Sequence, residues 1–511
     1  MGFAAKIATN ASSSRIQSLN ALRTLLQRDP AAALQAVRLR DPRSESIAGE
    51  SDFIAGAALY ALGRDDEAEQ SLQNALRNNP LHRLAGMCLA DLLRNQGRYR
   101  AATEVIEALI ASSPGDPAFA LQAIYFLRGC QQDAAAERIW KSTQSGAGPD
   151  SFYVGGLIAM SLGDFAAARE RLDRCIGMDP NYQDAILARV HAGDSSTPDD
   201  FDAYVHRVAD DREKLSKANR IVLDFALGKL ALDRGEIANA FAHYDRANKE
   251  QLESIVEDRK TARPLADPPR RPDPSTPQGA DGNDVVLIVG MPRSGTTLLA
   301  ARLGQHPQIA DRSELPWLGM LGRSAISAGT YLRHLRQDDA PRLRYIDKNP
   351  LNFRFLDRAT REFPRVRILH CRRDPRDVAV SCYTQFFPHP DMEWSCSWKG
   401  ILDFQQHYRA LIEQRPRDIA WMDIDYESLV SASDSTLWAA IEFLGLDWND
   451  SVLAIPADGV VNTASVWQAR QPMHSRSLGR WRETAACTTA LLEAYGDQPE
   501  PRNWFRPTTS P

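Results

Sequence analysis

The residues best suited to chemistry form a short loop, 291–297, rich in glycine and hydroxyl side chains, that follows an aliphatic run at 285–289. The aliphatic run is typical of a buried strand, and Leu298, Leu299 and Leu303 after the loop have helical spacing. A strand, a small-residue loop and a helix start together point backbone N–H groups at an anion. The sequence therefore predicts a phosphate-binding loop, with candidate contacts from Pro292, Arg293, Ser294, Gly295, Thr296 and Thr297.

The loop differs from that of nucleotide hydrolases in the position of its basic residue. Gly290 and Gly295 have the G-x-x-x-x-G spacing, but Thr296 stands where those enzymes have the lysine that reaches the β- and γ-phosphates. The basic residue is Arg293, inside the loop. Such a loop can hold a phosphate but is poorly equipped for a magnesium-bound triphosphate. A tight connection in an α/β domain, without a ligand, is the alternative interpretation.

The segment 292–297, Pro-Arg-Ser-Gly-Thr-Thr, closely resembles the 5′-phosphosulfate loop of sulfotransferases that use 3′-phosphoadenosine 5′-phosphosulfate (PAPS) as donor. PAPS has no β- or γ-phosphate, so the resemblance accounts for the missing lysine and implies that no metal is needed. It also implies a second anion site, because the donor carries a separate 3′-phosphate.

Arg373 and Ser381 are the candidates for that second site. Residues 366–371 form another apolar run, which Arg373 follows, and Ser381 comes eight positions later. Sulfotransferases of this family have an arginine and a serine at the same spacing. A guanidinium binds phosphate bidentately, and a hydroxyl adds a further donor. A solvated cluster of arginines is the alternative interpretation.

The resemblance extends to the tyrosylprotein sulfotransferases and to bacterial sulfotransferases with tetratricopeptide repeats. It implies a catalytic base at Glu314, which lies 21 positions after Arg293, and a catalytic lysine at Lys348. Asn349 replaces the aspartate of that family's Lys-Asp-Pro motif. The same resemblance, which covers about residues 284 to 482, implies nucleotide contacts from Tyr426, Ser465 and Arg480, with arginine at 480 in place of the family's lysine.

These residues imply sulfuryl transfer in line between two oxygen atoms. Arg293 and Lys348 would stabilise the negative charge that develops on the leaving bisphosphate, and Glu314 would accept the proton of the acceptor hydroxyl. Each of these residues also has an ordinary structural explanation as a surface or loop side chain. We expect His306 and His370 to be structural, at a helix end and in the core respectively.

Composition and charge argue against several classes of protein. The chain has 511 residues, enough for more than one domain, and its net charge of −5 argues against a general nucleic-acid binder. No apolar run reaches the roughly 18 residues of a transmembrane helix, so we expect no membrane partner. The seven cysteines are scattered without a C-x-x-C pair, which favours reduced thiols in a cytoplasmic protein over disulfides or a metal site.

The first half of the chain is repetitive. Gly63 and Gly97 lie 34 residues apart, as do Gly129 and Gly163. A 34-residue period with small residues at the turn between two helices is typical of tetratricopeptide repeats. We therefore expect residues 1–260 to form an all-α solenoid of helical hairpins. Its groove suits a protein or peptide acceptor, whereas assembly of a homodimer is the alternative role.

A proline-rich stretch, 261–283, separates this half from the region with the anion-binding motifs. Short apolar runs at 285–289, 343–346, 365–371 and 419–424 then alternate with helical stretches over residues 284–505. This alternation predicts an α/β domain with a parallel sheet, covered by helices and binding its ligand beyond the carboxyl ends of the strands.

Together these features favour a repeat solenoid joined to a PAPS-dependent sulfotransferase that acts on a hydroxyl, with a protein or peptide tyrosine as the leading acceptor. Two other hypotheses stay open at this point. A nucleotide kinase would use a similar loop, and a non-catalytic repeat scaffold could carry a degenerate P-loop domain. The missing lysine argues against the first, and the presence of suitable polar residues at most of the family positions argues against the second.

Overall fold

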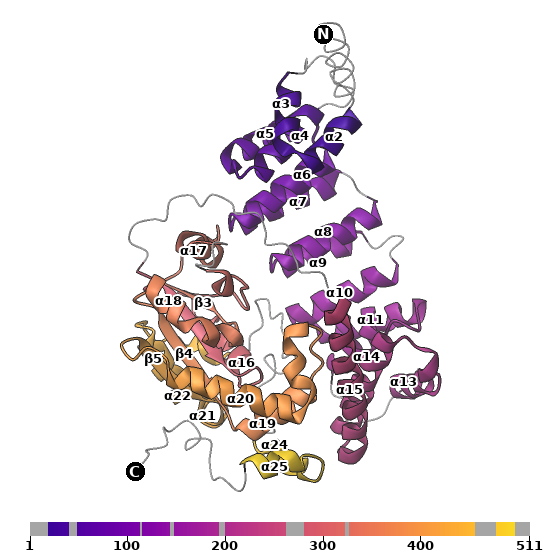
Figure 1. Cartoon of the computed structure of the whole chain (residues 1–511), viewed down its shortest axis with the longest axis vertical. Coiled ribbons are helices and arrows are strands. Elements are labelled where there is room, and N and C mark those ends of the chain that lie inside the picture. The colour runs from indigo at the N-terminus through magenta and orange to yellow at the C-terminus, as the bar shows by residue number, and fades with distance from the viewer. Residues whose placement is uncertain are drawn as a thin grey trace, which may run out of the picture. The chain divides into compact units, whose positions relative to one another are not determined.

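The computed structural model describes residues 19–39, 49–112, 115–143, 148–193, 200–261, 281–321, 326–454 and 477–495 (Figure 1). The chain forms two compact units. One consists of Met1–Gly146, Pro268–Thr276 and Ser324–Ala340, and the other of Ala147–Asp267, Pro277–Arg323 and Pro341–Pro511. Most of the proline-rich stretch lies outside the described residues.

The first unit is built from helical hairpins. Its helices are α2 (Leu19–Arg28), α3 (Pro30–Arg38), α4 (Glu50–Ala61), α5 (Asp65–Asn78), α6 (Arg83–Asn95), α7 (Tyr99–Ser112), α8 (Pro117–Gly129), α9 (Asp133–Ser142) and α17 (Ala328–Arg336). The turns after α4 and α6 pass through Gly63 and Gly97, whose φ angles of 75° and 76° lie in the left-handed region that favours glycine. The repeated glycines therefore mark the turns between paired helices.

Two hairpins of the first unit, α4–α5 and α6–α7, place a leucine of the second helix against a glycine of the first. A Cβ atom added to Gly56 would lie 2.7 Å from the Leu72 side chain, and one added to Gly86 would lie 2.4 Å from Leu109. Leu72 is fully buried and Leu109 nearly so. The second unit repeats the arrangement with Gly156 and Leu172. In these three helix pairs, the glycine therefore allows a close helix contact that buries the facing leucine.

Helix α17 is a segment of the C-terminal half that packs in the first unit. The Tyr99 hydroxyl and His334 Nδ1 are 2.9 Å apart, and both residues are buried. The Asp338 carboxylate accepts hydrogen bonds from the backbone N–H groups of Arg100 (2.8 Å) and Ala101 (2.9 Å), which are in the first turn of α7. A side chain remote in sequence therefore caps α7.

The second unit contains further helices and the sheet. Its helices before the sheet are α10 (Pro149–Leu162), α11 (Phe165–Met178), α12 (Gln183–His191), α13 (Asp200–Asp210), α14 (Lys217–Asp233) and α15 (Ile237–Thr261). The strands are β1 (Val285–Gly290), β2 (Ile309–Asp311), β3 (Arg344–Asp347), β4 (Arg367–Arg372) and β5 (Ala420–Asp425). They pair in parallel in the order β2-β3-β1-β4-β5.

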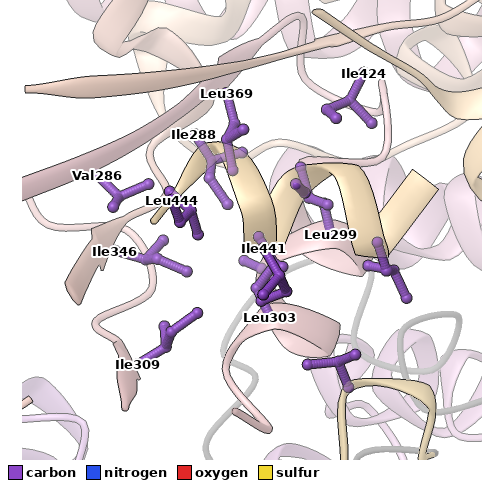
Figure 2. Packing of buried hydrophobic residues seen from close by; sticks show 14 of the residues in the cluster. Val286, Ile288, Leu299, Leu303, Ile309, Ile346, Leu369, Ile424, Ile441 and Leu444 are labelled. Atoms are coloured by element: carbon purple, nitrogen blue, oxygen red, sulfur yellow. The ribbon is translucent and has the colours of Figure 1, made fainter. Parts of the chain in front are cut away.

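Strand β1 lies at the centre of the sheet, and all six of its residues are buried. An apolar strand of this kind is expected where helices cover both faces of a parallel sheet. Below one face, Val286 and Ile288 of β1 pack with Leu299 and Leu303 of α16 (Thr296–Leu303) in a single apolar cluster (Figure 2). This core holds the loop between β1 and α16 in place.

The remaining elements complete the second unit. They are α18 (Leu356–Glu362), α19 (Pro375–Tyr383), α20 (Trp398–Glu413), α21 (Tyr426–Ser431), α22 (Ser433–Phe443), α24 (Arg480–Glu483) and α25 (Thr489–Tyr495), with 3-10 turns that include η4 (Pro350–Phe355) and η5 (Pro390–Cys396). The predicted fold class, a tetratricopeptide-repeat helical region followed by a parallel α/β domain, is confirmed. Strand β2 is not predicted from the sequence, because three residues are too few to show a periodic pattern.

We predict that Asp338→Ala destabilises the first unit by about 1 kcal/mol, because it removes the cap of α7. Glu104→Ala on the same helix is the matched control, since its contact with Arg100 is an exposed ion pair that contributes little. Urea unfolding followed by circular dichroism measures both variants. Equal stability of Asp338→Ala and the wild type would contradict the assignment of the cap.

Candidate functional site

The predicted anion-binding loop joins β1 to α16 and has an unusual backbone. Arg293 has a φ angle of 71°, which is uncommon for a residue with a side chain, and Gly295 has a φ angle of 99°. A Cβ atom at residue 295 would lie 2.5 Å from the Tyr426 ring. Only glycine therefore fits at this position. Thr296 is the first residue of α16, so the loop residues lie at the N-terminus of that helix.

Arg293 and Ser381 come from the two predicted anion sites and are in direct contact. Arg293 Nε donates a hydrogen bond of 2.8 Å to Ser381 Oγ on α19. Desolvation lowers the pKa of the Arg293 guanidinium to about 10, and the nearby cations Arg373 and Arg480 add to this effect. The guanidinium remains charged at neutral pH. The loop therefore presents a cation that gains stability from an added anion.

Arg373 follows β4 and lies against the same loop. It donates hydrogen bonds to the backbone carbonyls of Arg293 (2.9 Å) and Ser477 (2.6 Å). Its guanidinium carbon lies 4.4 Å from the centre of the Tyr426 ring, within the range of a cation–π contact. The Tyr426 hydroxyl is 3.0 Å from Ser477 Oγ. Four residues from three predicted motifs thus form one cluster: Arg293 of the loop, the pair Arg373 and Ser381, and Tyr426.

Two polar atoms in or next to this cluster, on Arg373 and on the loop residue Ser294, are buried without a hydrogen-bond partner among the described residues. Ser294 Oγ and Arg373 Nε accept or donate no hydrogen bond within the described part of the chain. Both residues line a small cavity, together with Met291, Cys371, Pro375, Val378, Gln405 and Tyr408. Buried polar groups are nearly always hydrogen-bonded in folded proteins. These two atoms therefore fit a site that gains a polar ligand or ordered water.

Glu314 and Lys348 form a second pair, at the carboxyl ends of β2 and β3. Lys348 Nζ lies 2.6 Å from Glu314 Oε1. Lys348 is almost fully buried, whereas 42% of the Glu314 side chain is exposed. The parallel pairing of β2 and β3 continues beyond the ends of both strands, where Lys348 N donates a hydrogen bond of 2.8 Å to Ser313 O. The sheet itself therefore sets the carboxylate beside the lysine and leaves it open to solvent.

Asn349 stands where the resembling family has aspartate, and its side chain bonds locally. Its Oδ1 accepts from Leu351 N at 3.1 Å, and its Nδ2 donates to Leu315 O at 3.4 Å. The amide thereby connects the start of η4 to the residue after Glu314. Asn349 can make both contacts because its amide accepts and donates, whereas an aspartate carboxylate could only accept.

A C-terminal segment, 477–481, is attached to the cluster through Asp377, a residue that the sequence analysis did not single out. The buried Asp377 carboxylate accepts hydrogen bonds from the backbone N–H groups of Gly479 (2.8 Å) and Trp481 (3.0 Å). Burial raises the pKa of this carboxyl group. Arg480 lies between the two bonded residues. Ser465, the remaining predicted contact, lies outside the described residues.

The two histidines have structural partners. His306 Nε2 is 3.0 Å from the Asp447 carbonyl, and its Nδ1 accepts from Gln308 N at 3.1 Å. His370 Nδ1 is 2.8 Å from Asp423 Oδ1, and its Nε2 contacts the Tyr408 hydroxyl. Burial lowers the pKa of His370. Both rings thus connect elements of the second unit.

Among the described residues, no group of three or more histidine, cysteine, aspartate or glutamate side chains could hold a metal ion. The seven cysteines are all free thiols. Burial raises the pKa of Cys382, next to the loop, to about 12. In the part of the chain that the structure describes, no helix combines the length and apolar character needed to cross a membrane.

Parts of the chain match models of known protein families. Residues 285–325 and 320–450 match the model of the sulfotransferase family, and residues 53–117 and 149–182 match models of the tetratricopeptide repeat. The chain therefore combines tetratricopeptide repeats with a domain of the sulfotransferase family.

The chain is similar to characterised and uncharacterised relatives at low identity. An uncharacterised protein of Aquifex aeolicus is 25% identical over 376 residues, which cover 66% of this chain and 49% of that protein. A protein-tyrosine sulfotransferase of Drosophila melanogaster is 24% identical over 236 residues, which cover 39% of this chain and 46% of that protein. The matches thus span about half the length of these two relatives.

Among solved structures, the sulfotransferase domain of the Synechococcus PCC 7002 olefin synthase is 20% identical, with a TM-score of 0.30. That match covers 42% of this chain and 97% of the other.

We predict that Asp377→Asn loosens the segment 477–481. An amide offers one acceptor oxygen, and its NH₂ group faces an N–H donor, so one backbone hydrogen bond is lost. Hydrogen exchange of the Gly479 and Trp481 amides should accelerate roughly fivefold, the equivalent of about 1 kcal/mol. Glu483→Gln, at an exposed position of α24, is the control. Unchanged exchange in Asp377→Asn would contradict this attachment.

Proposed function

We propose that this protein is a sulfotransferase that transfers a sulfuryl group from PAPS to a hydroxyl group, with a protein or peptide tyrosine as the leading acceptor. The observation that carries the proposal is the contact between the two predicted anion sites, Arg293 with Ser381 and Arg373 with the Arg293 carbonyl. A donor with two separate phosphate-containing ends needs two such sites within one cluster.

The loop supplies what the 5′ end of the donor requires. Backbone N–H groups at the start of α16 and the charged Arg293 suit the phosphosulfate. The unpartnered Ser294 Oγ offers a hydrogen bond nearby. Arg373 and Ser381 would bind the 3′-phosphate, and the Tyr426 ring already lies beneath the Arg373 guanidinium. Arg480 and Ser465 are further proposed contacts of the nucleotide.

The Glu314–Lys348 pair supplies what transfer to a hydroxyl requires. The bond between sulfur and the donor's phosphate oxygen breaks, a bond from sulfur to the acceptor oxygen forms, and the acceptor proton passes to Glu314. The half-exposed carboxylate can reach an incoming hydroxyl, and the buried lysine lies 2.6 Å from it, beside the proposed reacting groups. Arg293 and Lys348 then stabilise the adenosine 3′,5′-bisphosphate that leaves.

The repeats support an acceptor that is a protein or peptide. Tetratricopeptide hairpins form extended grooves that suit a chain segment, and a groove tethered to a transferase raises the local concentration of its acceptor. A homodimer through the repeats is the other proposed role. Seven cysteines without a disulfide favour a reducing, cytoplasmic location.

We predict that adenosine 3′,5′-bisphosphate raises the unfolding temperature without magnesium, because a ligand of the folded state stabilises it by mass action. Arg373→Ala should weaken this binding by about 1.5–3 kcal/mol, the loss of a charged hydrogen-bonding contact. Arg372→Ala is the matched control, since its guanidinium instead pairs with Asp425 at 2.8 Å.

Thermal unfolding and calorimetric titration measure these effects, with ATP and magnesium in a parallel arm. Stabilisation by ATP with magnesium but not by the bisphosphate would favour a nucleotide kinase and contradict the proposed function.

We predict that Glu314→Gln binds the bisphosphate like the wild type but loses most of its turnover, by about 10²–10⁴-fold, because an amide cannot take up the acceptor proton. The measurement is sulfation of a tyrosine-containing peptide by labelled PAPS across a pH series. Lys348→Ala should lower turnover as well. Full activity of Glu314→Gln at every pH would remove Glu314 from the role of base.

A further inference from the structure

Helix α15 belongs to the helical region by sequence, yet within the second unit its side chains bond to Tyr383, at the end of α19, and to Phe387 beyond it. Three polar side chains of α15, spaced three residues apart, face this end of α19. Asn248 and Gln251 are both nearly buried. Asp245 accepts a hydrogen bond from the Tyr383 hydroxyl (2.6 Å). Asn248 donates to the Tyr383 carbonyl (2.9 Å), and Gln251 donates to the Phe387 carbonyl (2.6 Å).

The bond from Asn248 meets a need of α19. The last four carbonyl groups of an α-helix have no partner within the helix, and a buried carbonyl left unpaired is costly. Tyr383 is the last residue of α19 and is 5% exposed, so solvent cannot readily serve its carbonyl. Asn248 Nδ2 provides the missing donor from a different part of the chain.

Aromatic contacts hold the same junction. The Tyr383 ring stacks on Trp398, with ring centres 4.0 Å apart, and Phe241 of α15 stacks on both rings at 6.3 Å. Phe386 packs on Phe225 of α14 with ring centres 5.3 Å apart. The aromatic residues in 384–388 and 394–398 are, from the sequence, equally consistent with a wall that binds the acceptor or with a packed loop. These contacts favour the packed loop.

The end of α19 matters because Ser381 lies there. Ser381 is two residues before Tyr383, and its Oγ accepts the 2.8 Å hydrogen bond from Arg293. A displacement of the last turn of α19 therefore moves the hydroxyl away from the loop arginine. Gln251, in contrast, bonds to Phe387, which lies beyond the helix end and carries none of the proposed donor contacts.

We propose that Asn248 is a positioning residue of the donor site: by bonding the terminal carbonyl of α19, it sets Ser381 against Arg293. This inference rests on the proposed function, since it assigns Ser381 and Arg293 to the donor. Its consequence is that the helical region completes the donor site from within the second unit, whatever its repeats bind.

The test compares Asn248→Ala with Gln251→Ala in the full chain. Each variant removes one side-chain amide that donates to a backbone carbonyl, from the same face of the same helix. Calorimetric titration gives the affinity for adenosine 3′,5′-bisphosphate, and unfolding without ligand gives the stability. We expect Asn248→Ala to weaken bisphosphate binding roughly five- to tenfold, and Gln251→Ala less than about twofold, at a similar loss of stability.

Asn248→Asp provides a second measurement that keeps the side-chain size. A protonated carboxyl group can donate to the Tyr383 carbonyl, whereas a carboxylate cannot. The affinity of Asn248→Asp for the bisphosphate, divided by that of the wild type, should therefore fall as the pH rises. Because both proteins are measured at the same pH, the titration of the bisphosphate itself cancels from this ratio. The titratable and charged groups near Asn248 include Asp245, Tyr383, Cys396 and the Arg259–Glu393 ion pair of 2.6 Å, and all of them are the same in the two proteins.

Three results would overturn the inference. These are wild-type affinity in Asn248→Ala, equal weakening by Asn248→Ala and Gln251→Ala, and a pH-independent affinity ratio for Asn248→Asp. Ser381→Ala separates this inference from the proposed function. If Ser381→Ala weakens binding and Asn248→Ala does not, only the positioning role fails. A wild-type protein that does not bind the bisphosphate overturns the proposed function and this inference with it.

Discussion

The contact on which the site depends is the one that Arg293 makes from inside the loop. Its backbone adopts a positive φ angle, its side chain bonds Ser381, and its carbonyl accepts from Arg373. A strained backbone persists only where its surroundings fix it, and here β4 and α19 do so. Two cations held this close, with desolvation already lowering the pKa of Arg293, favour the addition of an anion.

The Glu314–Lys348 pair depends on a different constraint, the register of two parallel strands. Short β2 lies beside β3, and the pairing continues until Lys348 N bonds the residue before Glu314. A buried lysine is costly without a partner, and the carboxylate at 2.6 Å provides one. The Glu314 side chain itself stays 42% exposed, so its carboxylate pairs with Lys348 and remains accessible from solvent.

The helical region contributes to the fold in two ways. In the first unit, glycine and leucine pairs close the hairpins, and α17 adds a cap to α7 through Asp338. In the second unit, α15 supplies hydrogen bonds to the end of α19. Each of these contacts joins a helix of the repeat region to a segment from the C-terminal half of the chain, and each provides a polar backbone group with a partner.

Features that depend on local spacing can be predicted from the sequence alone. These features are the glycines of the loop, the 34-residue period, and the apolar runs of β1, β3, β4 and β5. Each is a pattern of residue types along the chain that indicates a turn, a repeat or a buried strand. The resemblance added Glu314 and Lys348, which the fold brings together. Only the tertiary structure decided the contacts between distant residues, such as Asp377 with Gly479 and Asn248 with Tyr383. Those contacts answer the hydrogen-bonding needs of groups that become buried on folding, and no local pattern in the sequence records them.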